Sequence, residues 1–127
     1  GDVYKRQRNK EILQIMGYFK EDQDLEVFRN VLTHCEPMRW YPLFADIIAR
    51  GNSKSKGIDH VLEYYGIDLK DTMAFGDGGN DIPMLGHAGI GVAMGNASDE
   101  VKAAADYVTT SVDEDGIMNA LKHFGVL

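Results

Sequence analysis

From residue 53 to the end of the chain, short apolar runs alternate with segments whose apolar residues recur at helical spacing. Three of the runs are predicted to be buried strands, at 71–77 (DTMAFGD), 89–95 (GIGVAMG) and 106–111 (DYVTTS). Helices are predicted around them, at 53–65, at 80–88, from Ser98 and from about Asp113. This alternation is typical of an α/β fold with an open sheet of parallel strands, in which ligands bind at the carboxyl ends of the strands.

The first of these helices has recognisable ends. Ser53 or Ser55 can cap its start, and Gly66 can end it in a left-handed conformation. The residues between them that share one apolar face are Ile58, Val61, Leu62 and Tyr65. The local pattern therefore predicts a helix at this position.

The N-terminal third follows a different pattern. Helical spacing predicts one helix over 9–19 and another over 24–33 with Asp24 as its cap, and extended structure is expected over 38–49 with a break at Pro42. The opening GDVYKRQ has no initiating methionine and no apolar periodicity. We expect residues 1–7 to be a non-native or disordered lead, and the chain to begin inside a longer gene.

Composition limits the classes of partner. With 127 residues, 44% of them apolar, the chain has about the length of one domain, and its net charge of −7 argues against nucleic acid or an anionic membrane as a partner. Cys35 is the single cysteine, so an intrachain disulfide is excluded. Since the sequence shows neither a long apolar run nor a signal-peptide pattern, a cytoplasmic location is expected.

The stretch FGDGGNDIPML concentrates polar groups at the end of a predicted strand. Asp77 follows the strand and Asp81 lies in the first turn of the next helix, so the two carboxylates can face one point. Two like charges about 4 Å apart repel by roughly 4 kcal/mol at an effective dielectric near 20. A cation must therefore join them, or one of them must hold a proton. Oxygen ligands without histidine or cysteine nearby favour Mg²⁺.

The residues between the two aspartates suit an anion. Gly78 and Gly79 can adopt positive φ and let backbone N–H groups approach a ligand closely, and Asn80 adds a neutral amide at a helix start. These features together predict a phosphoryl site. A plain Gly/Asp turn is the ordinary alternative. A calcium-binding β-roll is rejected because only one copy of its repeat occurs, and the glycine spacing does not fit a dinucleotide fingerprint.

Several segments, in order, resemble haloacid-dehalogenase-type phosphatases of the Cof-type branch, which carry an α/β cap. GDGGNDIPML resembles the fourth motif of that family, and SKSKGIDHVLEYYGI resembles the third. GIGVAMGNASDEVKAAADYVT with DEDGIMNAL is similar to the closing segment of that branch. The resemblance covers about residues 36–127. It implies the tail of a cap at 8–50 and the C-terminal half of a Rossmann-like core at 51–127.

The resemblance also implies roles for individual residues at the strand ends. Asp77 would be a Mg²⁺ ligand, and Asp81 would be a second ligand or the hydrogen-bond partner of the catalytic lysine. Lys56 would be that lysine, pairing with a nucleophilic aspartate and with phosphoryl oxygens. Asn80 and the Gly78 backbone would contact the phosphate.

Two neighbours in the predicted cap could face a substrate. Arg39 would bind an anion, and Trp40 would stack on the substrate or exclude water. The ordinary alternative, Arg39 as a surface residue and Trp40 in the cap core, is left open. The four histidines show no metal-ligand spacing.

The family reaction begins with a DxDx[TV] motif, whose first aspartate attacks phosphorus and whose second is the acid and base. The Asp-x-Asp at Asp22 to Asp24 lies between predicted helices and is not in that context. We therefore expect a Mg²⁺-dependent phosphatase of sugar phosphates or other small phosphorylated metabolites whose nucleophile lies upstream. The alternative is a non-catalytic α/β fragment that at most binds Mg²⁺. Absence of the central strand would leave a sheet edge open to self-association.

Overall fold

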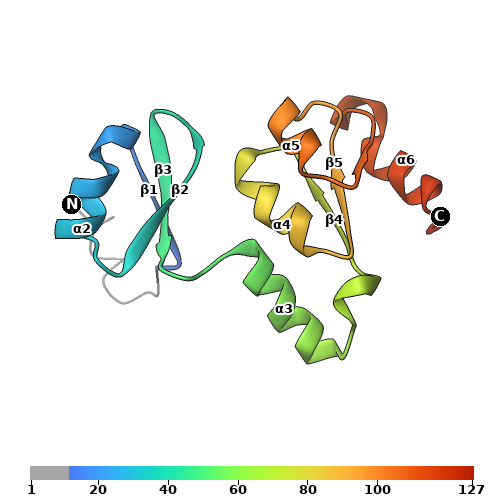
Figure 1. The fold of residues 1–127 in the computed structure, drawn as a ribbon, viewed down its shortest axis with the longest axis horizontal. Helices are drawn as coiled ribbons and strands as arrows, with labels where there is room; N and C mark the ends of the chain where they lie inside the picture. The colour runs from blue at the N-terminus through green and yellow to red at the C-terminus, as the bar shows by residue number, and fades with distance from the viewer. Residues whose placement is uncertain (1–11) are drawn as a thin grey trace, which may run out of the picture. The chain divides into compact units, whose positions relative to one another are not determined.

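The structure, a computed structural model, describes residues 12–127 apart from the side chain of Trp40 (Figure 1). The chain divides into two compact units between Asn52 and Ser53, and each is described by itself. The predicted lead at 1–7 lies outside the described residues. Assignment of the two units to a cap and a core domain stays a prediction.

Unit 1 contains an antiparallel sheet with strand order β1-β3-β2. Its strands are β1 Gln14–Gly17, β2 Cys35–Tyr41 and β3 Phe44–Ala49, and its helix is α2 Asp24–Asn30, which follows a 3-10 turn at Glu21–Gln23. The helix predicted over 24–33 and the extended region on either side of Pro42 are confirmed, but the cap assigned to Asp24 is wrong, because Gln23 is at the cap position and Asp24 is the first helical residue. From α2, Phe28 is buried, and its ring lies 5.9 Å from that of Phe19.

The helix predicted over 9–19 is wrong for its described part. Gln14–Gly17 forms a strand whose register on β3 pairs Ile15 with Ile47 and Gly17 with Ala45. The apolar spacing suited a helix, but backbone bonds to a strand about thirty residues further along the chain determine the conformation. The spacing of apolar residues over so short a segment does not distinguish a helix from a strand.

Unit 2 contains a parallel sheet with strand order β4-β5-β6. Its strands are β4 Met73–Gly76, β5 Ile90–Ala93 and β6 Tyr107–Val108. Its helices are α3 Lys54–Tyr65, α4 Ile82–His87, α5 Asp99–Ala103 and α6 Gly116–His123, and 3-10 turns occur at Leu69–Asp71, Gly79–Asp81 and Val112–Glu114. The predicted α/β fold with parallel strands is confirmed.

The predicted helix ends agree closely with those observed. The Ser53 hydroxyl caps α3 by accepting the backbone N–H of Lys56 at 3.1 Å, and Gly66 ends the helix at φ 65°. The last helix begins at Gly116, later than expected, because a 3-10 turn precedes it. Asp115 joins the two at φ 57°, a left-handed conformation that is uncommon outside glycine.

A cluster of buried side chains holds α4 and α5 against the sheet, and α6 lies on the other side of the strands in Figure 1. The cluster consists of Ala74, Leu85, Ala93, Ala97 and Val101. A Cβ on Gly91 of β5 would lie 2.2 Å from the Leu85 carbonyl oxygen, so only glycine permits this approach of α4 to the strand. This packing fixes the start of α4, where the predicted site residues lie.

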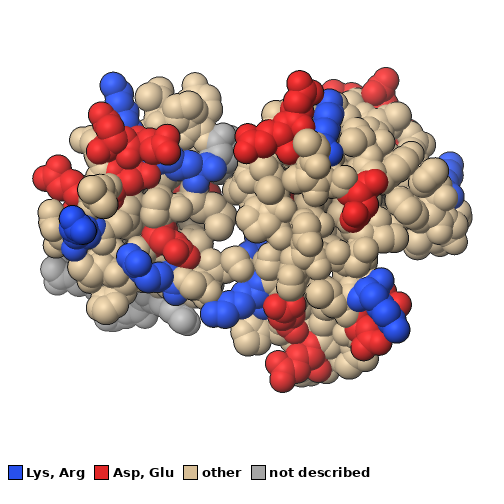
Figure 2. Space-filling model, in the orientation of Figure 1, with Lys and Arg blue, Asp and Glu red and all other residues tan. Residues whose placement is uncertain are grey.

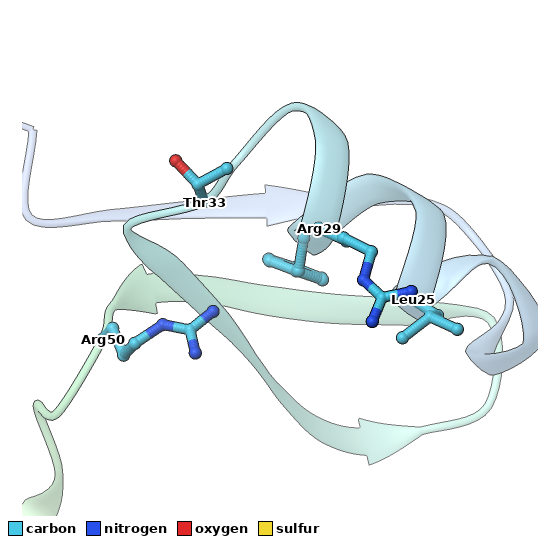
Figure 3. A pocket seen from close by; sticks show the side chains of 5 residues that line it. Leu25, Arg29, Thr33 and Arg50 are labelled. Carbon is cyan, nitrogen blue, oxygen red and sulfur yellow. The ribbon is translucent and has the colours of Figure 1, made fainter.

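The surface of each unit carries charges of both signs on the face drawn in Figure 2. Among the helices described, none has the length and apolar character needed to cross a membrane. Unit 1 has a surface hollow of about 520 Å³ (Figure 3). The residues that line it are Leu25, Phe28, Arg29, Thr33 and Arg50. None of these residues belongs to the predicted phosphoryl site.

Candidate functional site

The carboxyl ends of the three parallel strands are joined to one another by backbone hydrogen bonds. Beyond β5, the Met94 N–H donates to the Gly76 carbonyl at 2.9 Å, and the Gly95 N–H donates to the Thr110 carbonyl at 3.0 Å. A Cβ on Gly95 would lie 2.6 Å from the Ser111 nitrogen, so this contact requires glycine. The segments that follow β4, β5 and β6 therefore form one edge, and the predicted phosphoryl site lies there.

Asp81 is buried at this edge, with 6% of its surface exposed. Its Oδ2 accepts the backbone N–H groups of Asp77 and Gly78, both at 3.1 Å, and its Oδ1 accepts from the ammonium group of Lys54. Burial opposes ionisation of this carboxyl. The hydrogen bonds from Lys54, Gly78 and Asp77 outweigh that cost, so the pKa of Asp81 is lowered below its ordinary value.

The lysine that reaches Asp81 is Lys54, whereas the sequence analysis assigned this position to Lys56. Lys54 is the first residue of α3, and its side chain is 46% exposed. Lys56 lies two residues further along, with its backbone N–H in the helix cap. Because successive residues turn by about 100° around a helix axis, these two lysines leave α3 on nearly opposite sides.

Contacts between α3 and α4 explain which of the two lysines faces the site. The Ser55 hydroxyl donates to the Pro83 carbonyl at 3.3 Å, and His87 Nε2 lies 2.6 Å from Asp59 Oδ1. The pairing of Lys54 with Asp81 continues this line of contacts at the start of both helices. The start of α3 is thereby held beside the strand edge.

Asp77 differs from Asp81 in that its side chain is exposed. Its Oδ2 accepts the Nδ2 group of Asn96 at 3.1 Å, and its Oδ1 has no hydrogen-bond partner among the residues that the structure describes. Asn96 was missed by the sequence analysis. Its position directly after an apolar strand, at the end where ligands bind in parallel sheets, is the signal that could have indicated it.

The remaining residues of the loop support this arrangement without positive φ. Gly78 has φ −105°, and Gly79 is also outside the left-handed region, so neither uses the positive φ that glycine permits. A Cβ on Gly78 would lie 2.7 Å from Asn80 Oδ1, whereas one on Gly79 would meet nothing within 4 Å. The Gly78 N–H, expected to face a phosphate, donates to Asp81. Asn80 stays beside the two aspartates as a predicted phosphate contact.

Arg39 lies in unit 1 and has several protein partners. It donates to both carboxylate oxygens of Asp24 and, through Nη1, to the Phe19 and Phe44 carbonyls at 3.0 Å each. The guanidinium also lies 5.0 Å from the centre of the Phe19 ring. The hydrogen bond to Asp24 raises the pKa of Arg39 above its ordinary value. These contacts give Arg39 a structural role in its sheet, and its predicted role in binding substrate stays untested.

The donor set can be compared with what Mg²⁺ requires. Both oxygens of Asp81 are already bonded, which agrees with its alternative role as partner of the lysine, whereas Oδ1 of Asp77 is open. Among residues 12–127, no group of three His, Cys, Asp or Glu side chains is placed to hold a metal ion. A Mg²⁺ ion commonly keeps several waters and binds one or two carboxylates plus substrate phosphate. One open carboxylate fits that pattern as part of a site.

Comparison with known proteins identifies the family. The model of the haloacid dehalogenase-like hydrolases matches residues 2–121. This chain belongs to that family. A protein named as a candidate phosphatase, YkrA of Bacillus subtilis (strain 168), is 44% identical over 118 residues, which are 93% of this chain and 45% of YkrA. The predicted family is therefore confirmed.

Solved structures agree with the family and with its branch. The subclass IIB sugar phosphatase BT4131 is 53% identical with a TM-score of 0.82, and the match covers 98% of this chain and 47% of that one. The haloacid dehalogenase family phosphatase BT1666 of Bacteroides thetaiotaomicron is 47% identical with a TM-score of 0.88, covering 100% and 47%. The predicted Cof-type branch is confirmed. This chain spans about half the length of these relatives.

Proposed function

We propose that the protein carrying this chain is a Mg²⁺-dependent phosphatase that hydrolyses sugar phosphates or other small phosphorylated metabolites. The observation that carries the proposal is the pairing of Lys54 with Asp81 beside an exposed carboxylate, Asp77, at the carboxyl edge of a parallel sheet. A fixed ammonium group next to a candidate cation ligand is suited to a dianionic phosphate group. The relatives named as phosphatases support the reaction type.

Each residue contributes a distinct part of this mechanism. Asp81 holds the Lys54 ammonium group at the edge, and Lys54 offsets the charge that develops on the phosphoryl oxygens. Asp77 would hold Mg²⁺ through its open oxygen, and Asn80 would donate to a phosphoryl oxygen. When bound, Mg²⁺ polarises the phosphoryl group and neutralises part of its charge. The attacking aspartate is assigned to the part of the longer relatives that this chain does not span.

The test is turnover by the full-length protein on a panel of phosphate esters that includes sugar phosphates. We expect Asp77→Asn to lower turnover by about 100-fold or more, the scale of removing one charge-stabilising group. The matched control is Asp99→Asn, which removes an exposed carboxylate from the first turn of α5 and should leave turnover unchanged. Chelation of Mg²⁺ should abolish turnover, and added Mg²⁺ should restore it. Unchanged turnover in Asp77→Asn would overturn the proposal.

A second proposal concerns the 127-residue chain alone, which we expect to bind Mg²⁺ weakly and to lack turnover. Asp77 offers one open oxygen, and no group of three possible ligands is placed to hold a metal among residues 12–127, which favours this expectation. Phosphatase activity in the purified chain that is lost in its own Asp77→Asn variant would contradict it. Because activity from a contaminant would not respond to that substitution, the comparison separates the two sources.

A further inference from the structure

Asn96 bridges two segments of the strand edge through its side-chain amide. Its Nδ2 group donates to Asp77 Oδ2 at 3.1 Å, and its Oδ1 accepts the backbone N–H of Val112 at 3.1 Å. The amide therefore spans from the loop after β4 to the 3-10 turn after β6. Both of its ends are used, which fixes the plane of the amide as well as its position.

The backbone places Asn96 at this point with little freedom. The preceding residue, Gly95, is bonded to the Thr110 carbonyl and packs too closely on Ser111 for any side chain. Val112 is the first residue of its 3-10 turn, where a backbone N–H has no partner within the turn. Asn96 Oδ1 accepts the Val112 N–H, and this bond directs the Nδ2 group of the same amide at Asp77.

The hydrogen bond from Asn96 makes the two carboxylate oxygens of Asp77 different from each other. Its backbone N–H is held by Asp81, and its Oδ2 is held by Asn96, so rotation of the carboxylate would break the bond to Asn96. Oδ1 is the oxygen left for a ligand. A carboxylate that binds a metal is commonly oriented by such an outer partner, and loss of that partner typically costs about 10–100-fold in metal affinity or activity.

We propose that Asn96 is a positioning residue that fixes which oxygen of Asp77 faces the cation, with the Val112 N–H as the anchor of its amide. This proposal rests on the proposed function, because it requires a cation at Asp77. It predicts a defect in cation affinity that excess cation can overcome. A general loosening of the loop would instead lower stability or turnover at every cation concentration.

The primary experiment measures Mn²⁺ binding to the full-length protein by electron paramagnetic resonance, without substrate. We expect Asn96→Ala to weaken Mn²⁺ binding by about 10–100-fold. Val112→Pro should do the same, since proline deletes the N–H and places its ring where the Asn96 oxygen lies. The first position of a 3-10 turn accepts proline, and the extended backbone of Ser111, at φ −67° and ψ 167°, tolerates a proline after it. Val112 is 64% exposed, so the substitution removes little packing.

Asn119→Ala provides a matched control. Asn119 donates to Thr110 Oγ1 and to the Glu114 carbonyl at 2.9 Å each, so it ties the same loop without contacting Asp77. We expect its Mn²⁺ affinity to stay within twofold of the wild type. In steady-state assays, Asn96→Ala should raise the Mg²⁺ concentration needed for half-maximal rate by about 10–100-fold and keep most of kcat at saturating Mg²⁺.

The results separate this inference from the proposed function. If Asp77→Asn abolishes Mn²⁺ binding while Asn96→Ala leaves it unchanged, the positioning role is overturned and the proposed function stands. Equal losses in Asn96→Ala and Asn119→Ala would also overturn it, because loop order would then be the cause. If Asp77→Asn itself leaves both Mn²⁺ binding and turnover unchanged, both proposals are wrong.

Discussion

Each unit of the molecule contains a pairing of a cationic side chain with an aspartate, and the two pairs differ in what surrounds them. In unit 1, Arg39 and Asp24 are 15% and 20% exposed, and the guanidinium also binds two backbone carbonyls and lies near a phenylalanine ring. In unit 2, Lys54 and Asp81 lie beside Asp77, an exposed carboxylate with one open oxygen. The Arg39–Asp24 pair, whose further contacts lie within its own unit, stabilises the fold. The Lys54–Asp81 pair lies next to a carboxylate with an open oxygen and is therefore placed to act on a ligand.

The two units also differ in how they are packed. Among the described residues, the buried hydrophobic side chains of unit 1 are Phe28 and Ala45, whereas unit 2 has a continuous cluster between its sheet and helices. The polar contacts of Arg39 therefore carry more of the organisation of unit 1. The following four predictions test this contrast and are ordered by the expected change in the free energy of unfolding.

The largest effect is expected from Gly91→Ala in β5. The added methyl group would lie 2.2 Å from the Leu85 carbonyl oxygen, which is backbone and cannot move aside, so we expect a loss of about 3 kcal/mol or more. Gly86→Ala is the control, because its Cβ would meet nothing within 4 Å and should change stability by under about 1 kcal/mol, in the favourable direction. Urea denaturation measures both. A Gly91→Ala protein of wild-type stability would contradict the packing described for unit 2.

Arg39→Ala should destabilise unit 1 by about 2–3 kcal/mol, because Asp24 and two carbonyl groups lose their donor inside a partly buried site. Arg39→Lys should recover part of that loss, since an ammonium group cannot reproduce the forked contacts. Hydrogen exchange, followed separately in each unit, measures the effect. Normal protection of unit 1 together with weakened substrate binding would instead return Arg39 to the predicted ligand-binding role.

Lys54→Met should lower the free energy of unfolding by about 1–2 kcal/mol, because the buried Asp81 loses a charged donor and the lysine itself is partly exposed. The same substitution should reduce phosphatase turnover of the full-length protein. Lys56→Met is the paired variant, and we expect it to have the smaller effect on turnover. If Lys56→Met lowered turnover more than Lys54→Met, Lys56 would be the catalytic lysine, as the sequence predicted.

The smallest expected effect is the contribution of Asp81 to the pH dependence of the free energy of unfolding. Its pKa is lowered in the folded protein, so its contribution to stability is complete above the ordinary value of 3.8 and is lost as the pH falls through the lower folded value. In urea titrations, the difference in stability between the wild type and Asp81→Asn should therefore narrow as the pH falls below 3.8. A difference that stays constant down to pH 2 would show that ionisation of Asp81 is not involved.

Local patterns predicted the elements of unit 2 and the loop that carries the site. The strand ends, the Ser53 cap and the Gly66 terminus depend on neighbouring residues, so the sequence alone reveals them. The same holds for Asp77 and Asp81, which a strand-to-helix turn brings to one edge. The helix predicted over 9–19 was wrong because β3, far along the chain, supplies the partner of β1.

Two site residues could not be assigned from local pattern. Lys54 and Lys56 are both in the first turn of α3, and only the packing of α3 on α4 determines which of them faces Asp81. Asn96 is bonded to residues 19 positions before it and 16 positions after it, so no sequence spacing joins the three. In both cases the decisive contact is tertiary.

The backbone bonds that join the strand ends have a consequence for anyone who redesigns this edge. Since the bonds of Gly76 to Met94 and of Gly95 to Thr110 use main-chain atoms, they survive a change of side chain at Met94 or Thr110. In a saturation library, Thr110 should accept more amino acids than Gly95, although its replacement removes the hydroxyl that bonds to Glu114 and Asn119. A redesign of this edge should therefore substitute the surrounding side chains and keep the glycines at 76 and 95.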